Sequence, residues 1–163
     1  MNHREPMRGT DGRNLRDEPT VLVLAMVSTF RHELKTRGQG DAHDITGSVT
    51  RSLKESGLQN GVATVFVTGS TAGITTIEFE PGAVSDLNRV FEALAPRDGE
   101  YRHHLRWGDD NGSSHASAAL LGPSVAVPFA EGELLLGQWQ QIALFEFDTR
   151  ARRREIVVQI IGE

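Results

Sequence analysis

The stretch that decides the fold is SVAVPFAEGELLLGQWQQIALFEFDTRARRREIVVQII, residues 124–161. Apolar and polar side chains alternate along residues 124–129, 133–136, 141–147 and 155–161, and this period of two is typical of β-strands. The turn at residues 130–132 separates the first two segments by a length that suits antiparallel neighbours. This part of the chain therefore predicts four antiparallel strands.

The residues before this stretch predict further strands and the helices that cover them. Strands are expected at residues 20–34, 61–67 and 74–79, and the apolar strand 61–67 is expected to be covered on both faces. Helices are expected after Asp44, where Ile45, Val49 and Leu53 repeat at four-residue spacing, between Pro81 and Pro96, and at residues 115–121. The order of elements predicts an α+β fold, a mostly antiparallel, sandwich-like sheet system with helices packed on it.

Composition limits the function that this fold serves. The chain has 163 residues, 38% hydrophobic and 24% charged, which predicts one globular domain over residues 20–163 behind a flexible tail, residues 1–19. No apolar run approaches the roughly 20 residues of a membrane span. A net charge of −5 argues against nucleic-acid binding, and the lack of cysteine excludes disulfides and thiolate chemistry. We expect a cytoplasmic protein without membrane or nucleic-acid partners.

The richest group of candidate functional residues lies in the polar stretch 97–114. His103 and His115 flank a segment that contains Asp109 and Asn111. Imidazole and carboxylate together suit Zn²⁺, whereas carboxylates alone suit Mg²⁺. The alternative interpretation is a solvated loop with helix-capping acids and ordinary turn residues.

A second candidate is the small-residue segment TGSTAG, residues 68–73. The hydroxyls of Ser70 and Thr71 and the neighbouring backbone N–H groups suit an anion. The alternative is a plain hairpin turn between two strands.

A third candidate is the segment LGQWQQ, residues 136–141, where Trp139 and Gln140 interrupt an apolar run. Trp139 is either a core aromatic residue or part of a binding surface. The arginines within residues 150–154 form either a solvated turn or a phosphate-binding group.

Six motifs occur in order along the chain: GSTAGITTIE (69–78), YRH (101–103), DDNGSSH (109–115), LLGPS (120–124), LLLGQWQQI (134–142) and RRREIVVQIIGE (152–163). Together they resemble the YjbQ-like family, an uncharacterised protein family also called the secondary thiamine-phosphate synthases. The resemblance runs from about residue 20 to residue 163.

The resemblance implies a compact α+β sandwich that assembles as a homotrimer with clefts between subunits. It implies a divalent metal, zinc or magnesium, held by His103, His115 and Asp109, with these three residues and Glu78 in catalytic roles. Gly69 stands where many members have a histidine, so no role is assigned to that position. The substrate is expected to contact Ser70, Thr71, Asn111, Trp139 and Gln140.

The activity attached to the family joins a pyrimidine diphosphate to thiazole phosphate and releases pyrophosphate. Such a transfer requires a divalent ion and cationic groups near the departing diphosphate, and it requires that water be kept from the electrophile. The expected partner is therefore a small phosphorylated substrate. Two alternatives stay open: a metal-assisted hydrolase with the same ligands, and a non-catalytic trimer that binds a small anion or a metal.

Overall fold

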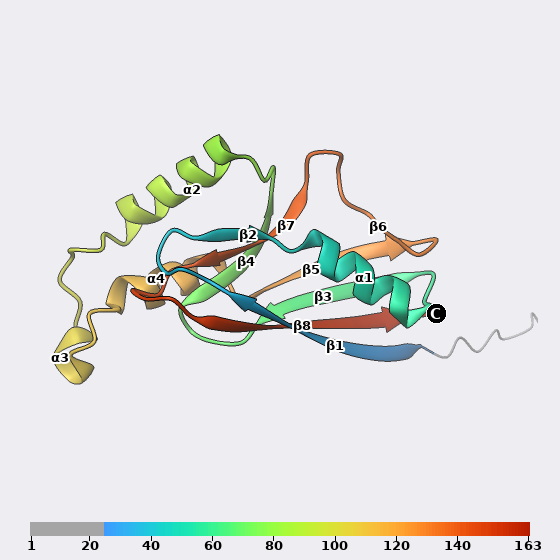
Figure 1. The fold of residues 1–163 in the computed structure, drawn as a ribbon, viewed down its shortest axis with the longest axis horizontal. Helices are drawn as coiled ribbons and strands as arrows, with labels where there is room; N and C mark the ends of the chain where they lie inside the picture. Colours follow the sequence, from blue (N-terminus) through green and yellow to red (C-terminus); the bar gives the residue numbers. More distant parts are fainter. Residues whose placement is uncertain (1–24) are drawn as a thin grey trace, which may run out of the picture.

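A computed structural model of the chain describes residues 25–163 (Figure 1). The expected tail, residues 1–19, lies outside the described residues. The elements follow in this order: β1 Met26–Lys35, β2 Ala42–Asp44, α1 Thr46–Ser56, β3 Gly61–Val67, β4 Ala72–Ile77, α2 Pro81–Leu94, α3 His104–Trp107, α4 Gly112–Leu121, β5 Ser124–Ala130, β6 Glu133–Leu134, β7 Gln141–Glu146 and β8 Arg153–Gly162. The predicted α+β class is confirmed, and the short elements β2 and α3 had not been predicted.

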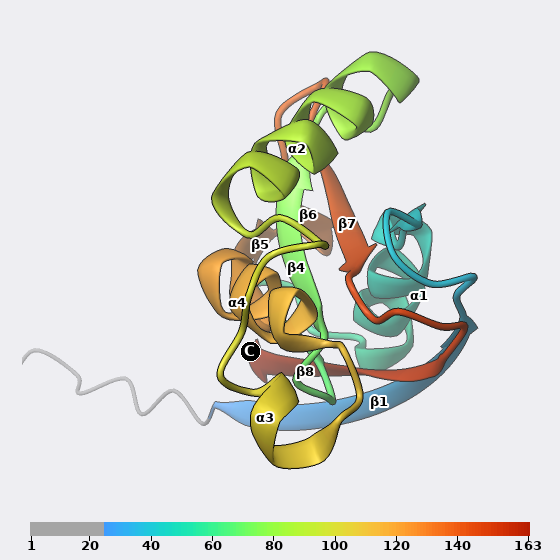
Figure 2. The ribbon, with the colours of Figure 1, turned by 90° about the vertical axis from the view of Figure 1, so that its left-hand side faces the viewer.

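The strands form two antiparallel sheets. The large sheet has the order β1-β8-β3-β5-β6, and the small sheet has the order β2-β7-β4. Strand β8 lies between β1 and β3, and Val158 is the partner of Phe30 on one side and of Val65 on the other. Figure 2, which looks along the molecule from the α3 end, shows α1 and α2 on different sides of β7.

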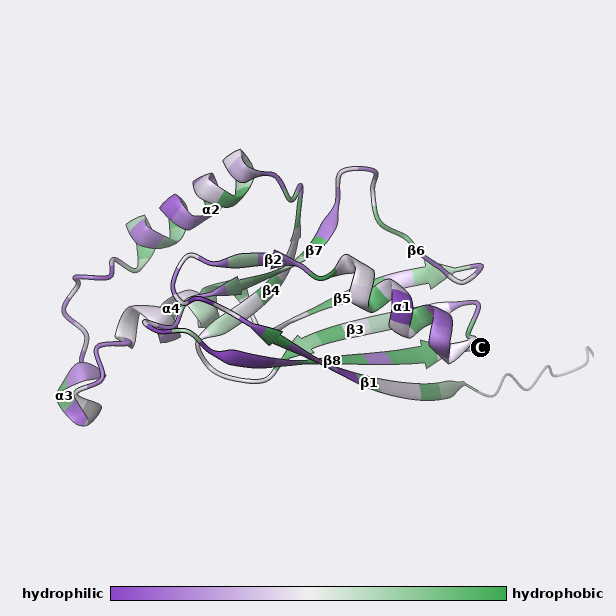
Figure 3. Cartoon of the chain, in the orientation of Figure 1, coloured by the Kyte–Doolittle hydropathy of each residue, from purple (hydrophilic) through white to green (hydrophobic). Residues whose placement is uncertain are grey.

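The main hydrophobic core lies between the inner face of the large sheet, helix α1 and one face of the small sheet. Val49 and Leu53 of α1 are completely buried in this core, as their four-residue spacing predicted. The helix ends at Gly57, whose φ of 72° is the left-handed conformation that glycine adopts without steric penalty. Figure 3 shows the hydrophobic residues of β3 and β8 below this helix. No helix within residues 25–163 has the length and apolar character needed to span a membrane.

Strand β7 is buried on both faces because it contributes to two cores. Ile142 and Leu144 belong to the main core, while Phe145 belongs to a second core that includes residues of α2 and α4. The ring of Phe91 in α2 lies 6.4 Å from that of Phe145, measured between centroids. The small sheet is therefore an interior layer between two hydrophobic regions.

The outer face of the large sheet, in contrast, is exposed in the described chain. Val27, Val62, Phe66 and Ile161 carry exposed side chains on β1, β3 and β8, and Ile161 is the register partner of both Val27 and Val62. The expectation that strand 61–67 is covered on both faces is thus wrong for a single chain. The four residues together are called the open sheet face below. Grouped apolar side chains of this kind mark interaction surfaces.

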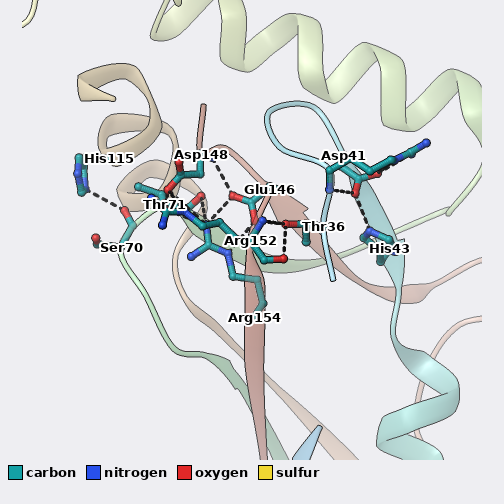
Figure 4. A network of polar contacts seen from close by, with 11 residues as sticks. Thr36, Asp41, His43, Ser70, Thr71, His115, Glu146, Asp148, Arg152 and Arg154 are labelled. Atoms are coloured by element: carbon teal, nitrogen blue, oxygen red, sulfur yellow. Dashed lines mark hydrogen bonds and ion pairs between the residues drawn. The ribbon is translucent and has the colours of Figure 1, made fainter. Parts of the chain in front are cut away.

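A buried polar network joins the two sheets where β7 ends and β8 begins (Figure 4). Glu146 is fully buried and accepts a hydrogen bond from Nε of Arg154 at 2.7 Å, and Nη2 of Arg154 contacts its second oxygen. Thr36 Oγ1 donates to the same carboxylate at 2.7 Å, and the backbone N–H of Asp148 donates at 2.8 Å. Since Arg154 is only 6% exposed, the interpretation of residues 150–154 as a solvated turn is wrong for this residue.

We expect Glu146→Gln to lower the free energy of unfolding by about 3–5 kcal/mol, because it leaves the buried guanidinium of Arg154 without its counter-charge. The measurement is urea denaturation of the full-length chain. The matched control is Glu33→Gln, which removes an exposed ion pair with Arg153 (2.9 Å) and costs at most about 1 kcal/mol. Equal losses in the two variants would contradict a special contribution from the buried pair.

A second ion cluster surrounds Asp41, just before β2. The backbone N–H of Arg37 donates to its carboxylate at 2.9 Å, the Arg37 guanidinium contacts it at 2.6 Å, and Nε2 of His43 lies 2.8 Å away. Burial raises the pKa of Asp41, but the hydrogen bonds from Arg37 and His43 outweigh burial and lower the pKa from 3.8 to about 2. The ionised carboxylate is therefore favoured in the folded state.

Asp41→Asn is expected to lower the free energy of unfolding by about 2–2.5 kcal/mol at pH 7. The pKa of Asp41 is depressed in the folded state, so its contribution is complete above pH 4 and disappears as the pH falls from about 4 to 2. Urea denaturation of the unaltered chain and of Asp41→Asn at pH 7, 5 and 3 measures the difference in their free energies of unfolding. A difference between the chains that is as large at pH 3 as at pH 7 would show that the carboxylate charge is not the source.

Candidate functional site

The polar stretch predicted at residues 97–114 connects α2 with α4 and contains the short helix α3. His103 precedes α3, and His115 lies in the first turn of α4. The centroids of their two rings are 4.6 Å apart, and Nε2 of His103 lies 3.5 Å from Oδ1 of Asp109. The three residues expected to bind a metal are thus close together, and they are called the histidine cluster below.

The hydrogen bond of His115 fixes which of its ring nitrogens is free. Nδ1 of His115 lies 3.1 Å from the carbonyl oxygen of Ser70 (Figure 4). A carbonyl oxygen only accepts hydrogen bonds, so Nδ1 carries the proton in this contact and Nε2 of the neutral ring keeps its lone pair. In His103, the Asp109 carboxylate favours the proton on Nε2 and leaves Nδ1 free. An imidazole with one nitrogen held by an oxygen and the other free is typical of metal ligands.

The shape of this loop depends on close packing between Tyr101 and Gly112. A Cβ atom at Gly112 would lie 2.4 Å from Cβ of Tyr101, so no larger residue fits without movement of the backbone. The Tyr101 hydroxyl donates to the carbonyl of Pro96 at 2.9 Å, and the Gly112 N–H donates to Nε2 of His104 at 3.1 Å. His104 therefore stabilises the loop, and His103 and His115 remain as the candidate ligands.

Thr71 connects the buried network to the histidine cluster. Its hydroxyl donates to Oδ2 of Asp148 at 2.8 Å and accepts from Nη2 of Arg154 at 2.7 Å. Because this hydroxyl is buried and engaged, Thr71 fixes the position of Ser70 beside His115. The segment 68–73 joins β3 of the large sheet to β4 of the small sheet, so its interpretation as a hairpin turn is wrong.

Two pockets adjoin the histidine cluster. The arginine pocket has a volume of about 180 Å³ and is lined by Asp109, Asn111, Asp148, Thr149, Arg150 and Arg152. The alanine pocket has a volume of about 330 Å³ and is lined by Gly69, Ser70, Ala72, His115, Ala118, Ala119 and Pro123. Asp109 belongs to the first pocket and His115 to the second, so the histidine cluster lies between a charged pocket and a largely apolar one.

Asp148 had not been identified as a functional candidate from the sequence, whereas Arg152 belongs to the arginines within residues 150–154, which were expected to form either a solvated turn or a phosphate-binding group. Nε of Arg152 donates to Oδ2 of Asp148 at 2.8 Å. Burial raises the pKa of Asp148, but hydrogen bonds from Arg152 and Thr71 outweigh burial and lower it. The available signal was a pair of acidic residues, Glu146 and Asp148, in an apolar strand pattern followed by arginines.

The donor set of the histidine cluster suits a metal only in part. Residues 25–163 contain no group of three His, Asp or Glu side chains already placed to hold a metal ion. The cluster offers two imidazole nitrogens and one carboxylate, and that carboxylate contacts His103. Two nitrogen ligands with further positions open to an additional group fit zinc and similar ions.

The remaining predicted site residues lie elsewhere in the described chain. Glu78 follows the last residue of β4 and Ser70 precedes its first, so the six-residue strand separates them by about 20 Å. Nε2 of Gln140 donates to Oγ1 of Thr76 at 2.9 Å, near the Glu78 end of the strand. Trp139 is 66% exposed, and its interpretation as a core residue is therefore wrong. Within one chain, Glu78, Trp139 and Gln140 do not reach the histidine cluster.

Comparison with known sequences identifies a family. Residues 30–163 match the sequence profile of the family described as UPF0047 protein YjbQ-like. A UPF0047 protein of Methanocaldococcus jannaschii is 33% identical over 144 residues, which cover 88% of this chain and 99% of that protein. A UPF0047 protein of Methanothermobacter thermautotrophicus is 37% identical over 141 residues, which cover 86% and 96%.

Solved structures show the same fold. A YbjQ-like protein of unknown function from Sulfolobus solfataricus has a TM-score of 0.77 at 31% identity and covers 85% of this chain and 100% of its own. An uncharacterized conserved protein of the YjbQ/UPF0047 family from Clostridium acetobutylicum has a TM-score of 0.73 at 34% identity and covers 80% and 98%. By its sequence and its fold, the chain belongs to the YjbQ-like UPF0047 family.

Proposed function

We propose that this protein is a divalent-metal-dependent transferase of the secondary thiamine-phosphate synthase type, which joins a pyrimidine diphosphate to thiazole phosphate. The observation that carries the proposal is the histidine cluster, with two imidazoles 4.6 Å apart between a pocket that contains two arginines and a largely apolar pocket. This arrangement offers metal ligands, positive charge for phosphate and an apolar surface for a ring at one place.

His103 and His115 would hold the metal, since each has one ring nitrogen that its contact with Asp109 or Ser70 leaves free. The bound divalent ion supplies positive charge where negative charge develops. Arg150 adds a guanidinium group on the side of the arginine pocket. In the transfer, the thiazole ring nitrogen supplies an electron pair and forms a C–N bond with the pyrimidine methylene carbon. The bond between that carbon and the diphosphate oxygen breaks, the oxygen keeps its electron pair, and pyrophosphate leaves, stabilised by the positive charge at the site.

The alanine pocket suits the heterocycle. Ala72, Ala118 and Ala119 present small apolar side chains, and the backbone and hydroxyl of Ser70 provide polar atoms at the same pocket. An apolar cavity with few polar groups is the usual environment of a flat ring. The ring and its phosphate group would then lie on opposite sides of the histidine cluster.

We further propose that the site is completed by a neighbouring subunit in a homotrimer. The side chains of His103 and Asp109 are 34% and 42% exposed, whereas a transfer reaction must keep water from its electrophile. A neighbouring copy that presents its Glu78 and Trp139 would cover this surface and supply a carboxylate. The open sheet face is the apolar surface available for such an assembly.

The activity test uses the full-length chain with Mg²⁺ or Zn²⁺, a pyrimidine diphosphate and thiazole phosphate, with mass-spectrometric detection of thiamine phosphate. We expect product that depends on metal, and a loss of about 100-fold or more in His103→Ala. His43→Gln, which removes an imidazole far from the cluster, is the control and should retain activity. Release of pyrophosphate and a pyrimidine alcohol at the same rate without thiazole phosphate would contradict the transferase and support a metal-assisted hydrolase, which the exposure of the cluster favours.

The metal prediction is tested apart from activity. His103→Ala and His115→Ala should each lose most of the metal that the unaltered chain retains after dialysis, because each removes one of two imidazole ligands. Elemental analysis of folded protein measures the metal, and circular dichroism checks the fold. If both variants keep a full equivalent, the metal is bound elsewhere.

The assembly prediction concerns the open sheet face. Sedimentation equilibrium of the full-length chain at micromolar concentration should give three times the mass of one chain. Phe66→Glu should yield monomers, because it places a charge in the proposed interface. Val90→Glu, at an exposed apolar position of α2, is the matched control and should leave the trimer intact. A monomeric unaltered chain would overturn the proposal.

A further inference from the structure

The arginine pocket contains positive charge that the rest of the chain does not neutralise. The Arg150 side chain is exposed and makes no hydrogen bond or ion pair with any residue of the described part, 25–163. Arg152 uses Nε to contact Asp148, and about a third of its side chain, 35%, remains exposed. Two guanidinium groups are therefore available to an oxyanion at this pocket.

The same pocket is lined by two residues whose buried oxygen atoms lack a hydrogen-bond donor. Oδ1 of Asn111 and Oδ1 of Asp148 have no hydrogen-bond partner among the described residues, although the two residues are only 8% and 2% exposed. Buried acceptors are normally paired, because an unpaired one loses its hydration without replacement. Asn111 occupies the N-cap position of α4 without a side-chain capping hydrogen bond, so the positive end of this helix lies at the pocket.

These observations restrict the chemistry of a ligand. The guanidinium groups require negative oxygens, whereas the unpaired oxygens of Asn111 and Asp148 require a hydrogen-bond donor. A bare metal cation would be repelled by Arg150, and an oxyanion without a proton would be repelled by the Asp148 carboxylate. An oxyanion that carries a proton satisfies both requirements. Inorganic phosphate keeps at least one proton at neutral pH, and sulfate keeps none.

We propose that the arginine pocket is a phosphoryl-binding site that selects a protonated oxyanion. Arg150 and Arg152 bind the phosphate oxygens, while Asp148, with Asn111 beside it, accepts the hydrogen bond of the P–OH group. The pocket therefore distinguishes phosphate from sulfate, two anions of similar size and shape. This inference deepens the proposed function. The binding of phosphate itself does not depend on that function, whereas the assignment of the phosphoryl group to a substrate or product rests on it.

The experiment is isothermal titration of the full-length chain with inorganic phosphate and with sulfate, at pH 7.5 and without added metal. We expect phosphate to bind at least about 10-fold more tightly, since sulfate leaves the acceptors unpaired. Arg150→Ala should weaken phosphate binding by about 10-fold or more. Arg153→Ala is the matched control: it removes an exposed arginine three positions away, paired with Glu33, and should change the affinity less than twofold.

Equal affinities for phosphate and sulfate would overturn the proposal, because water would then satisfy the two oxygens. An unchanged affinity in Arg150→Ala would overturn it as well. The comparison of the two anions uses the unaltered chain. A substitution of Asp148 would also disturb the buried network and could change the fold. His103→Ala separates this proposal from the proposed function: it should lose metal and activity while phosphate binding persists. If the unaltered chain binds metal and forms product but does not bind phosphate, only the phosphoryl site is contradicted.

Discussion

The buried pair of Glu146 and Arg154 is the constraint on which the arrangement of the two sheets depends. A carboxylate and a guanidinium removed from water require nearly complete hydrogen bonding, and here the partners come from four separate parts of the chain. Thr36 follows β1, Thr71 precedes β4, Glu146 ends β7, and Arg154 lies in β8. These four segments can satisfy the charges only in one relative position. The same contacts place Ser70, the neighbour of Thr71, against His115, so the geometry of the candidate site follows from the network.

The elements with a strong periodic pattern could be predicted from the sequence. The spacing of Val49 and Leu53 ahead of Gly57 predicted α1, and the strand at residues 61–67 has the predicted bounds. The network could not be predicted, because its members are up to 118 residues apart and no local pattern relates Thr36 to Arg154. The three-residue strand β2 depends on its pairing with β7 and is too short to carry a periodicity of its own.

The candidate site, too, could be predicted from the sequence only in part. His103, Asp109 and His115 are near each other in sequence, and the structure brings them together through a loop whose polar composition identified it. Glu78 and Trp139 belong to motifs of equal clarity, yet β4 separates Glu78 by about 20 Å from Ser70, which contacts His115. Gln140, the neighbour of Trp139, bonds to Thr76 near the Glu78 end of the same strand. A sequence motif indicates that a residue has a role but not which copy of the chain it serves. For the arginines within residues 150–154, the sequence left a solvated turn and a phosphate-binding group as alternatives, because the free charge of Arg150 can be recognised only when the partners of Arg152 and Arg154 are known.

The position of β8 has a consequence for the order in which the chain can fold. This strand follows all the other strands of the described residues in sequence, yet it lies inside the large sheet, between β1 and β3. During synthesis, β1 and β3 leave the ribosome without their shared neighbour, and the two edges that will later pair with β8 stay unpaired until residues 153–162 emerge. Closure of the large sheet therefore waits for β8 and joins β1 to a segment more than 100 residues away, which is a slow step by loop-closure entropy. Until then the nascent chain exposes strand edges that favour association with other chains.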